Sequence, residues 1–489
     1  MHASETSLRQ AKATYKNARR AELPNRKAVR EDQALPQLAL ALDPQKMRAA
    51  FEEYFRREYP QHGVIVDEVY VGKSYHKPGR GCDVNYGVNC RDRDNHAHYL
   101  LLHGKISADG EGQRKSMETA PASWPGCGFW KPVCFWPEMN MLITAFPYDP
   151  ELPNLGLLME PEFVKRQVEE NLAAFGLPSG WKCVEVNCQN LKYRPGKRCI
   201  LRYEILATGP AGEQRRLVFY GKTYDTAKSR YVYEILQNLA ASPACAGGRL
   251  NIPQPIAHID EANTIWSHAW EGTNLSHVVG ELGWAKLPQT GYVPKIATML
   301  AALHQLEMPG LQLSPVPSLW MALKNACGDA SDIAAFLPEK QEELERLTTS
   351  LEAVAAELEA DLPTATIHGS FKIAQILCRD QELALLDFDS IGRGDPLFDV
   401  AELLASFIYL RISDEIPAAP IAESVEIFLA NYAEQVPWPC ERRRLAWYLI
   451  GFLLGKMHAS LKRSEPSATA NMPLAFEIMR EWLKFVVTP

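Results

Sequence analysis

Side chains able to bind anions, bind hard cations or exchange protons are concentrated in one segment, residues 367–399. The segment contains His368, Ser370, Lys372 and Gln375, followed by Asp387 and Asp389 after an apolar stretch. A lysine ammonium attracts anions, and carboxylate and amide oxygens are hard ligands of the kind that Mg²⁺ prefers. A serine hydroxyl, by contrast, cannot accept a proton at neutral pH as a carboxylate does. This combination is the strongest chemical signal in the sequence.

The order and spacing of these residues resemble the catalytic core of the aminoglycoside phosphotransferase and choline kinase-like family, relatives of the protein kinases. The family pattern is H-G-D-x-x-x-x-N, then an apolar strand ending in D-x-[DEG], then G-D-P-x-x-D-[LV]-A. This chain reads His368-Gly-Ser-Phe-Lys-Ile-Ala-Gln, then Leu383-Ala-Leu-Leu-Asp-Phe-Asp, then Gly394-Asp-Pro-Leu-Phe-Asp-Val-Ala. The spacing is met at every step, and Leu300–Gln305 resembles the family's helix upstream of this core. The resemblance covers roughly residues 180–489.

The resemblance implies phosphoryl transfer from ATP with the help of Mg²⁺. It implies that Lys222 grips the phosphates, with Glu234 as the ion-pair partner that orients it. The turn that would cover the phosphates contains Arg194, Gly196 and Lys197, and backbone groups around His268 and Ala269 would hold the adenine. Leu250–Pro255 and Trp266–Gly272 would form the strand and the hinge between two lobes.

The same resemblance gives roles to the residues of segment 367–399. Asp387 would be a ligand of Mg²⁺, with Gln375 and Asp389 as further ligands, and Lys372 would steady the γ-phosphate. His368 is expected to be a buried support for the loop and not a base. Asp395 and Asp399 are expected to hold the loop and to cap the helix that follows.

Two residues depart from the family pattern. Ser370 stands where the family has its catalytic aspartate, and Gln375 stands where it has a metal-binding asparagine. The second change is mild, because glutamine keeps the amide oxygen and maltokinase-like members also use it. The first removes the expected general base, which is worth roughly 10²–10⁴-fold in rate.

Two functions therefore remain open. The first is an ATP- and Mg²⁺-dependent phosphotransferase that acts on a hydroxyl of a small molecule, such as a sugar or an amino alcohol. Positioning and electrostatic stabilisation supply most of phosphoryl transfer, so a slow kinase can survive without the aspartate. The second is a pseudokinase that binds nucleotide or a protein partner and regulates or scaffolds. Neither hypothesis names the acceptor.

An internal repeat organises the first half of the chain. Shifted by 117 residues, 68–105 falls on 185–222 without a gap and with nine identities in 38 positions. The matched residues include the Pro-Gly turns at 78–79 and 195–196, Tyr86 with Tyr203, and Gly104-Lys105 with Gly221-Lys222. Each copy predicts three antiparallel strands with a tight turn between the first two. Lys105 is expected to be structural, because no catalytic loop follows it.

Other elements follow from hydrophobic periodicity. Met141–Phe146 is predicted to be a strand, and Glu162–Phe175 and Thr226–Leu239 are predicted to be helices. Later helices are predicted at Val293–Leu306, Glu339–Leu358, Pro396–Leu410, Ala422–Tyr432, Arg442–Leu461 and Pro473–Val486. Aromatic residues at Trp124, Phe129, Trp130, Phe135 and Trp136 could form a sugar-stacking platform or simply pack a loop.

Composition limits the class of protein. The 489 residues include 52 basic and 59 acidic ones, so the formal charge is −7, which argues against a nucleic-acid-binding surface. The longest apolar run, Leu445–Gly455, has eleven residues, whereas a membrane helix needs roughly 20. No apolar stretch follows the first Met, so a secretory signal is not expected. The eleven cysteines form no C-x-x-C pair, so reduced thiols in a cytoplasmic protein are expected.

The expected fold class is α+β, with a bilobal protein-kinase-like fold preceded by a duplicated β-meander domain. The expected domains are a flexible basic tail at 1–35, a degenerate copy of the N-lobe meander at 36–176, the N-lobe at 177–272 and a helical C-lobe at 273–489. The tail is more often solvated than a basic contact arm. The copy at 36–176 is expected to be a lid or an interaction domain for a protein partner.

Overall fold

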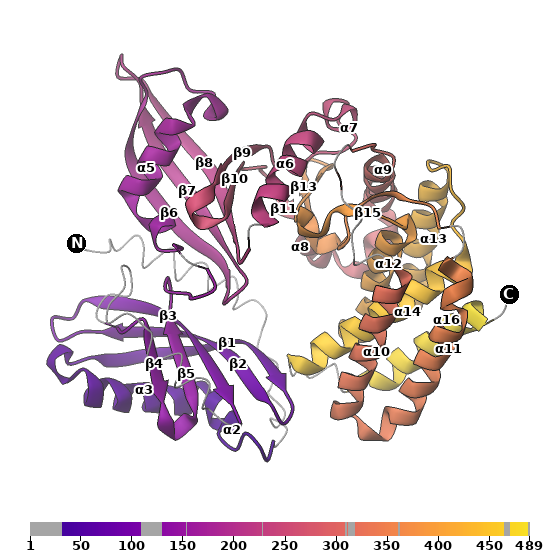
Figure 1. The fold of residues 1–489 in the computed structure, drawn as a ribbon, viewed down its shortest axis with the longest axis horizontal. Coiled ribbons are helices and arrows are strands. Elements are labelled where there is room, and N and C mark those ends of the chain that lie inside the picture. The colour runs from indigo at the N-terminus through magenta and orange to yellow at the C-terminus, as the bar shows by residue number, and fades with distance from the viewer. Residues whose placement is uncertain are drawn as a thin grey trace. The chain divides into compact units, whose positions relative to one another are not determined.

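The computed structural model describes residues 32–108, 130–152, 154–226, 228–308, 311, 318–359, 362–463 and 470–487. The chain divides into two compact units (Figure 1). The first consists mainly of Met1–Arg230 and Ile256–His268, and the second mainly of Tyr231–Pro255, Ala269–Leu461 and Ser467–Pro489. Most of the predicted tail lies outside the described residues.

A helix and a five-stranded antiparallel sheet begin the first unit. The elements are α2 (Leu38–Ala41), α3 (Pro44–Glu58), η1 (Pro60–His62), β1 (Ile65–Lys77), β2 (Gly81–Arg91), β3 (Ala97–Ser107), β4 (Val133–Trp136), η2 (Pro137–Met139) and β5 (Met141–Ala145). The strand order is β1-β2-β3-β5-β4. Asp43 caps α3 by accepting from Gln45 N and Lys46 N, and Pro44 occupies the first helical position. Phe51 and Phe55, four residues apart, are fully buried on one face of α3.

A second sheet repeats this arrangement. Its elements are η3 (Leu157–Met159), α5 (Pro161–Glu170), η4 (Leu172–Phe175), β6 (Lys182–Arg194), β7 (Arg198–Thr208), β8 (Gln214–Tyr224), β9 (Pro255–Ile259), η5 (Asp260–Ala262) and β10 (Thr264–His268). The strand order is β6-β7-β8-β10-β9, so it matches the first sheet strand for strand. The predicted repeat is therefore a repeat of the whole sheet.

The two sheets also share their register at the offset of 117. Ile65 pairs with Arg91 as Lys182 pairs with Thr208, and the first bulge falls at 66/68 in one sheet and at 183/185 in the other. A glycine lies beneath a tyrosine ring in each copy. A Cβ at Gly104 would come within 3.0 Å of the Tyr86 ring, and one at Gly221 within 3.1 Å of the Tyr203 ring. The identities found in the sequence thus include two glycines at which a larger residue would crowd a tyrosine ring.

The two sheets have separate hydrophobic cores. The first core runs from Leu35 to Ala145, and the second begins at Leu152. Leu35 is buried, so it belongs to the first module and not to the predicted tail. The segment 152–175 packs against the second sheet, whereas the sequence assigned it to the first domain. The reason is that η3, α5 and η4 supply the helical layer of their own sheet, as α2 and α3 do in the first copy.

The aromatic residues near β4 pack inside the first core. Trp130 and Trp136 are buried against Phe51 and Tyr54, with ring centroids 5.2–6.4 Å apart. These two tryptophans are therefore not available for stacking on a sugar. Trp124 and Phe129 lie outside the described residues.

The second unit is mainly helical. Its elements include most of α6 (Lys228–Ala240), then α7 (Pro243–Ala246), β11 (Thr273–Asn274), α8 (Leu275–Leu282), η6 (Trp284–Gln289), α9 (Tyr292–His304), α10 (Leu319–Phe336), η7 (Pro338–Lys340), α11 (Gln341–Glu359), β12 (Ala365–Ile367), η8 (Ile373–Gln375), β13 (Ile376–Arg379), β14 (Glu382–Leu385), η9 (Phe388–Ser390), β15 (Gly392–Gly394), α12 (Pro396–Ser413), α13 (Ala418–Ala433), α14 (Arg442–Lys462) and α16 (Met472–Val487). Antiparallel sheets ahead of a helical region confirm the α+β class.

Most of the predicted helices are present, with boundaries moved by a few residues. The helices α8 and α10 were not predicted; the buried face of α10 consists partly of alanines, which give a weak apolar signal. The strand predicted at Leu250–Pro255 is wrong. The strand β9 starts only at Pro255, and the prolines at 253 and 255 lack the N–H that a ladder needs.

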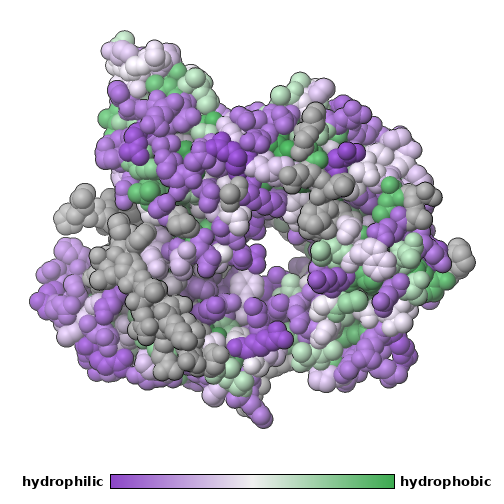
Figure 2. Space-filling view, in the orientation of Figure 1, coloured by the Kyte–Doolittle hydropathy of each residue, from purple (hydrophilic) through white to green (hydrophobic). Residues whose placement is uncertain are grey.

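Apolar residues are scattered in small groups among hydrophilic ones on the face seen in Figure 2. Of the helices in the described part of the chain, none is long and apolar enough to span a bilayer. Even α14, which contains the longest apolar run of the sequence, carries basic residues at both ends.

Candidate active site

The loop after β12 is held in place by one buried carboxylate. Asp399 on α12 accepts hydrogen bonds from His368 N (2.6 Å) and Gly369 N (2.8 Å), and His304 Nε2 lies 3.1 Å from its Oδ2. Gly369 has a φ of +74°, and a Cβ there would lie 2.2 Å from Ser390 O. Because glycine has no Cβ, the backbone at Gly369 can lie close to Ser390, and this contact fixes the loop against η9.

Behind Asp399 lies a chain of polar contacts between helices. His304 Nδ1 is 2.6 Å from the Tyr432 hydroxyl, which accepts in turn from Trp438 Nε1 at 3.1 Å. Asp399 and His304 have no exposed side-chain surface. Asp395 caps α12 by accepting from Leu397 N, and Arg444 Nε lies 3.1 Å from its other oxygen. The predicted capping role of Asp395 is confirmed, and Asp399 holds the loop.

His368 is fully buried inside this loop. Its Nε2 donates to Leu386 O at 2.9 Å, and its ring lies 5.2 Å from that of Phe388. Burial lowers the pKa of His368, although nearby carboxylates, Asp399 first among them, oppose the shift. The imidazole is therefore neutral at physiological pH, with its proton directed at a backbone carbonyl.

Asp387 and Gln375 lie side by side. Gln375 Nε2 is 3.4 Å from Asp387 Oδ2, and Gln375 Oε1 accepts from Lys372 N at 3.1 Å. Asp387 takes the left-handed conformation with a φ of +69°, two residues after the end of β14. Asp389 is half-buried in η9. The fold thus brings the loop after β12 next to the end of β14, so that the predicted metal ligands Gln375 and Asp387 are adjacent.

Lys372 has a partner that the sequence did not indicate. Its Nζ lies 3.0 Å from Glu402 Oε1, three residues beyond Asp399 on α12. Burial raises the pKa of Glu402, while the charges of Lys372 and Lys456 oppose the shift. Lys456 Nζ in turn donates to Ser406 Oγ at 3.0 Å. Ser370 is half-buried, and across the described ranges no hydrogen bond joins its hydroxyl to a carboxylate.

The remaining predicted residues are divided between the two units, with Lys222 near the end of the first. Lys222 is on β8 between Ile200 of β7 and Ile265 of β10, and its Nζ is 5.2 Å from the centroid of the Tyr224 ring. Glu234 is exposed on α6 and belongs to the second unit. The pairing of Lys222 with Glu234 stays a prediction.

The turn between β6 and β7 is well defined. Lys197 N donates to Arg194 O at 3.0 Å, Gly196 has a φ of +65°, and Lys197 Nζ pairs with Asp225 at 3.0 Å. Gly196 N also donates to Asp149 Oδ2 at 2.8 Å. Sequence reasoning missed Asp149, although at the offset of 117 residues Asp149 aligns with Asp32.

The predicted hinge coincides with the division between the units. β10 ends at His268, and the second unit resumes at Ala269. His268 Nε2 lies 2.9 Å from Ala174 O, and its ring lies 6.0 Å from that of Phe175. His268 is thus tied to the helical layer of the second sheet.

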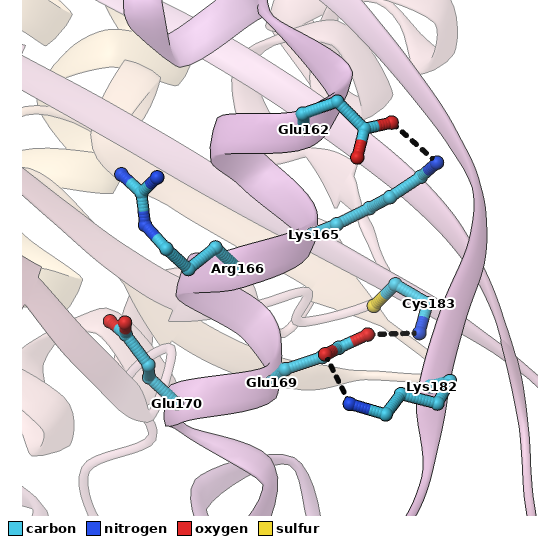
Figure 3. Close-up of a pocket in the computed structure, with 7 residues that line it drawn as sticks. All are labelled: Glu162, Lys165, Arg166, Glu169, Glu170, Lys182 and Cys183. Atoms are coloured by element: carbon cyan, nitrogen blue, oxygen red, sulfur yellow. Dashed lines mark hydrogen bonds and ion pairs between the residues drawn. The ribbon is translucent and has the colours of Figure 1, made fainter.

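A surface hollow of about 500 Å³ lies between α5 and β6 (Figure 3). Its lining is charged and largely paired: Glu169 accepts from Lys182 Nζ at 2.9 Å and from Cys183 N at 3.0 Å, and Lys165 pairs with Glu162 at 2.8 Å. None of the site residues predicted from the sequence lines it. The contacts of Glu169 fasten α5 to its sheet.

One family model matches part of the chain. Residues 208–434 match the model of APH, the phosphotransferase enzyme family. The resemblance predicted from the sequence is confirmed for this region. The APH region contains Lys222, the hinge and the whole of segment 367–399, but the match covers somewhat less than half of the chain and begins after the Arg194–Arg198 turn.

Solved structures give the same kind of match. An aminoglycoside phosphotransferase from Streptomyces rimosus is 19% identical, with 59% of this chain and 97% of that one covered and a TM-score of 0.37. A choline kinase from Cryptosporidium parvum is 13% identical, with 67% and 96% covered and a TM-score of 0.43. TM-scores below 0.5 are too low to carry details of a site to this chain. No curated protein matches it.

Proposed function

We propose that this protein is an ATP- and Mg²⁺-dependent phosphotransferase that acts on a hydroxyl of a small molecule, such as a sugar or an amino alcohol. The observation that carries the proposal is the juxtaposition of Gln375 and Asp387, 3.4 Å apart, within the APH region. Both follow a loop whose backbone is fixed by Asp399. A cytoplasmic location is part of the same proposal.

The carboxylates fit a divalent cation. Asp387 and Asp389 offer hard oxygen ligands that would hold Mg²⁺, and the cation would supply positive charge to neutralise the phosphates of ATP. Gln375 directs its amide nitrogen at Asp387, because its oxygen accepts from Lys372 N. To serve as a ligand, its amide must turn over and give up that hydrogen bond. Asp387 is therefore the principal ligand in this proposal.

Cationic groups would bind the phosphates. Lys222 would hold the α- and β-phosphates with Glu234 as its partner, and the turn of Arg194, Gly196 and Lys197 would cover them. Backbone groups at His268 and Ala269 would bind adenine. These assignments are supported by the position of Lys222 on β8 and by the division of the units at the hinge.

The chemical step then depends on positioning. His368 would orient the loop from its buried position, and Ser370 would lie near the acceptor hydroxyl without removing its proton. Little covalent work falls to the protein in phosphoryl transfer, so held geometry and charge neutralisation can supply most of the acceleration. Lys372 would steady the γ-phosphate from its place beside Glu402.

A pseudokinase is the second candidate, and Ser370 is the observation that favours it. Its hydroxyl has no hydrogen bond to a carboxylate in the part of the chain that the structure describes, so no general base is evident beside it. Such a protein would bind nucleotide or a protein partner, the latter through the first sheet module within residues 36–176.

One experiment separates the two candidates. Binding of MgATP is measured by calorimetry, and ADP release is measured with a panel of sugars and amino alcohols. We expect binding in the wild type, its loss in Asp387→Ala, and turnover with at least one acceptor. The exposed residue Asp414 provides a matched control, Asp414→Ala, which should bind as the wild type does. Binding without any turnover would favour the pseudokinase, and absence of binding would refute both the phosphotransferase and a pseudokinase that binds nucleotide.

A further inference from the structure

A buried carboxylate holds the turn between β6 and β7. Asp149 is only 5% exposed, and its Oδ2 accepts from Gly196 N at 2.8 Å and from the Tyr193 hydroxyl at 2.7 Å. Its Oδ1 accepts from Glu151 N at 2.9 Å, which fixes the carboxylate itself. Hydrogen bonds to a charged acceptor are the strong ones, so the contacts with Gly196 and Tyr193 restrain the turn.

The first module contains the same arrangement 117 residues earlier. Asp32 Oδ2 accepts from Gly79 N at 2.9 Å and lies 2.8 Å from His76 Nε2, and its Oδ1 accepts from Ala34 N at 3.0 Å. The turn of Lys77–Arg80 closes with the same hydrogen bond as that of Arg194–Lys197. Burial raises the pKa of Asp32, but the hydrogen bonds from Gly79 and His76 outweigh it and lower the pKa. The geometry thus occurs twice in one chain.

The surroundings of the two turns differ. On the outer face of the second sheet, Lys222 lies opposite Ile200, whereas in the first sheet Lys105 lies opposite Asp83. An aspartate across the strand pair offers the lysine a charge partner and weakens its attraction for a phosphate. The second module therefore combines the held turn with a lysine whose two cross-strand neighbours, Ile200 and Ile265, are apolar.

We propose that Asp149 is a positioning residue for nucleotide binding, because it fixes the turn that carries Arg194 and Lys197. The inference rests on the proposed function. Gly196 N donates to Asp149, Lys197 N donates to Arg194 O, and Pro195 has no N–H, so the cationic side chains of Arg194 and Lys197 would do the binding. Asp149 acts through the turn and does not touch the nucleotide.

The test compares matched substitutions in the two modules. Asp149→Ala removes the acceptor, Asp149→Asn keeps one oxygen for Gly196 N, and Asp32→Ala makes the same change in the first module. The dissociation constant of the MgATP analogue AMP-PNP is measured by calorimetry, and amide hydrogen exchange is measured over residues 77–80 and 194–197. Tyr193→Phe offers a milder change should Asp149→Ala fold poorly.

We expect Asp149→Ala to weaken AMP-PNP binding about tenfold, Asp149→Asn and Tyr193→Phe to weaken it less, and Asp32→Ala to leave it within about twofold. Exchange should accelerate at 194–197 in Asp149→Ala and at 77–80 in Asp32→Ala. Equal binding by Asp149→Ala and wild type, or unchanged exchange at its turn, would overturn the inference. A wild type that binds no nucleotide refutes the proposed function instead, and then only the exchange data bear on Asp149.

Discussion

Lys372 Nζ lies 3.0 Å from Glu402 Oε1, and the Glu402 side chain is only 8% exposed. This pair joins the loop that carries Ser370 to α12, beside the contacts that Asp399 makes. Lys372 is thus held by a buried acid on a helix. The sequence pattern alone predicted only that Lys372 lies next to the γ-phosphate.

The first prediction concerns the pH dependence of stability. The folded state raises the pKa of Glu402 above its ordinary value of 4.5, so above that value the folded chain binds more protons than the unfolded chain. Wild-type stability therefore falls as pH rises from 4.5 through the folded pKa. Glu402→Gln lacks this loss, and its stability relative to wild type should increase as the pH rises above 4.5 in urea unfolding. The exposed control Glu423→Gln should give a constant difference, and a constant difference for Glu402→Gln would contradict the prediction.

The second prediction concerns the buried anchor of the loop. Asp399→Ala leaves His368 N, Gly369 N and His304 without their acceptor, so unfolding free energy should fall by about 3–5 kcal/mol. Urea unfolding of the second unit measures this, with Asp414→Asn as a surface control that should change it by less than about 0.5 kcal/mol. A loss below about 1 kcal/mol would show that the loop is held by other contacts.

The third prediction uses two glycines. Gly369→Ala forces a Cβ to within 2.2 Å of Ser390 O at a φ of +74°, so η9 must shift and MgATP binding should weaken about tenfold or more. Gly328 lies within α10 with open space around it, so Gly328→Ala should leave binding unchanged and stabilise the helix by about 0.5–1 kcal/mol. Calorimetry and thermal unfolding read out both. Equal MgATP binding by the two variants would contradict the prediction that a Cβ at Gly369 displaces η9.

The fourth prediction restores the family pattern. If Ser370 occupies the position of the general base, Ser370→Asp should raise the rate of ADP release with an active acceptor by about 10²-fold. Ser370→Ala should stay within about threefold of wild type, because the hydroxyl it removes is not a base. A slower Ser370→Asp enzyme would mean that this position does not face the acceptor hydroxyl.

The sequence predicts the site better where residues are close along the chain. Gln375 and Asp387 belong to one motif, and their 3.4 Å separation follows from a loop and a hairpin that the spacing already indicates. Glu402 is 30 residues from Lys372 on a helix, where a single glutamate resembles any solvated charge. The pair therefore needs the tertiary structure to be found.

The prediction of the fold is limited in the same way, because contacts between residues far apart in the chain leave no local pattern. The repeat predicts three strands per copy, because strands and Pro-Gly turns leave periodic patterns. Asp149 leaves none, since one aspartate in an irregular segment has no period, although the offset of 117 already pointed from Asp32 to it. The predicted domain boundary at 176/177 stays a prediction. The packing of α5 in the core of the second sheet could not be predicted for a related reason: a helical layer joins its sheet through packing, and α5 contacts β6, which follows it in the chain.

The shared register of the two sheets has a consequence for folding. Because β1–β2 and β6–β7 pair alike, each strand offers the hydrogen-bonding pattern that the other sheet needs, and strand exchange between neighbouring repeats is a characteristic route to misfolded chains. Bulk in the cores opposes it: Ile143 lies across from Gly104, whereas Trp266 lies across from Gly221. If β5 and β10 were exchanged, Ile143 would leave a cavity in the place of Trp266, and Trp266 would clash in the place of Ile143. Side-chain volume, and not backbone geometry, keeps the two copies apart.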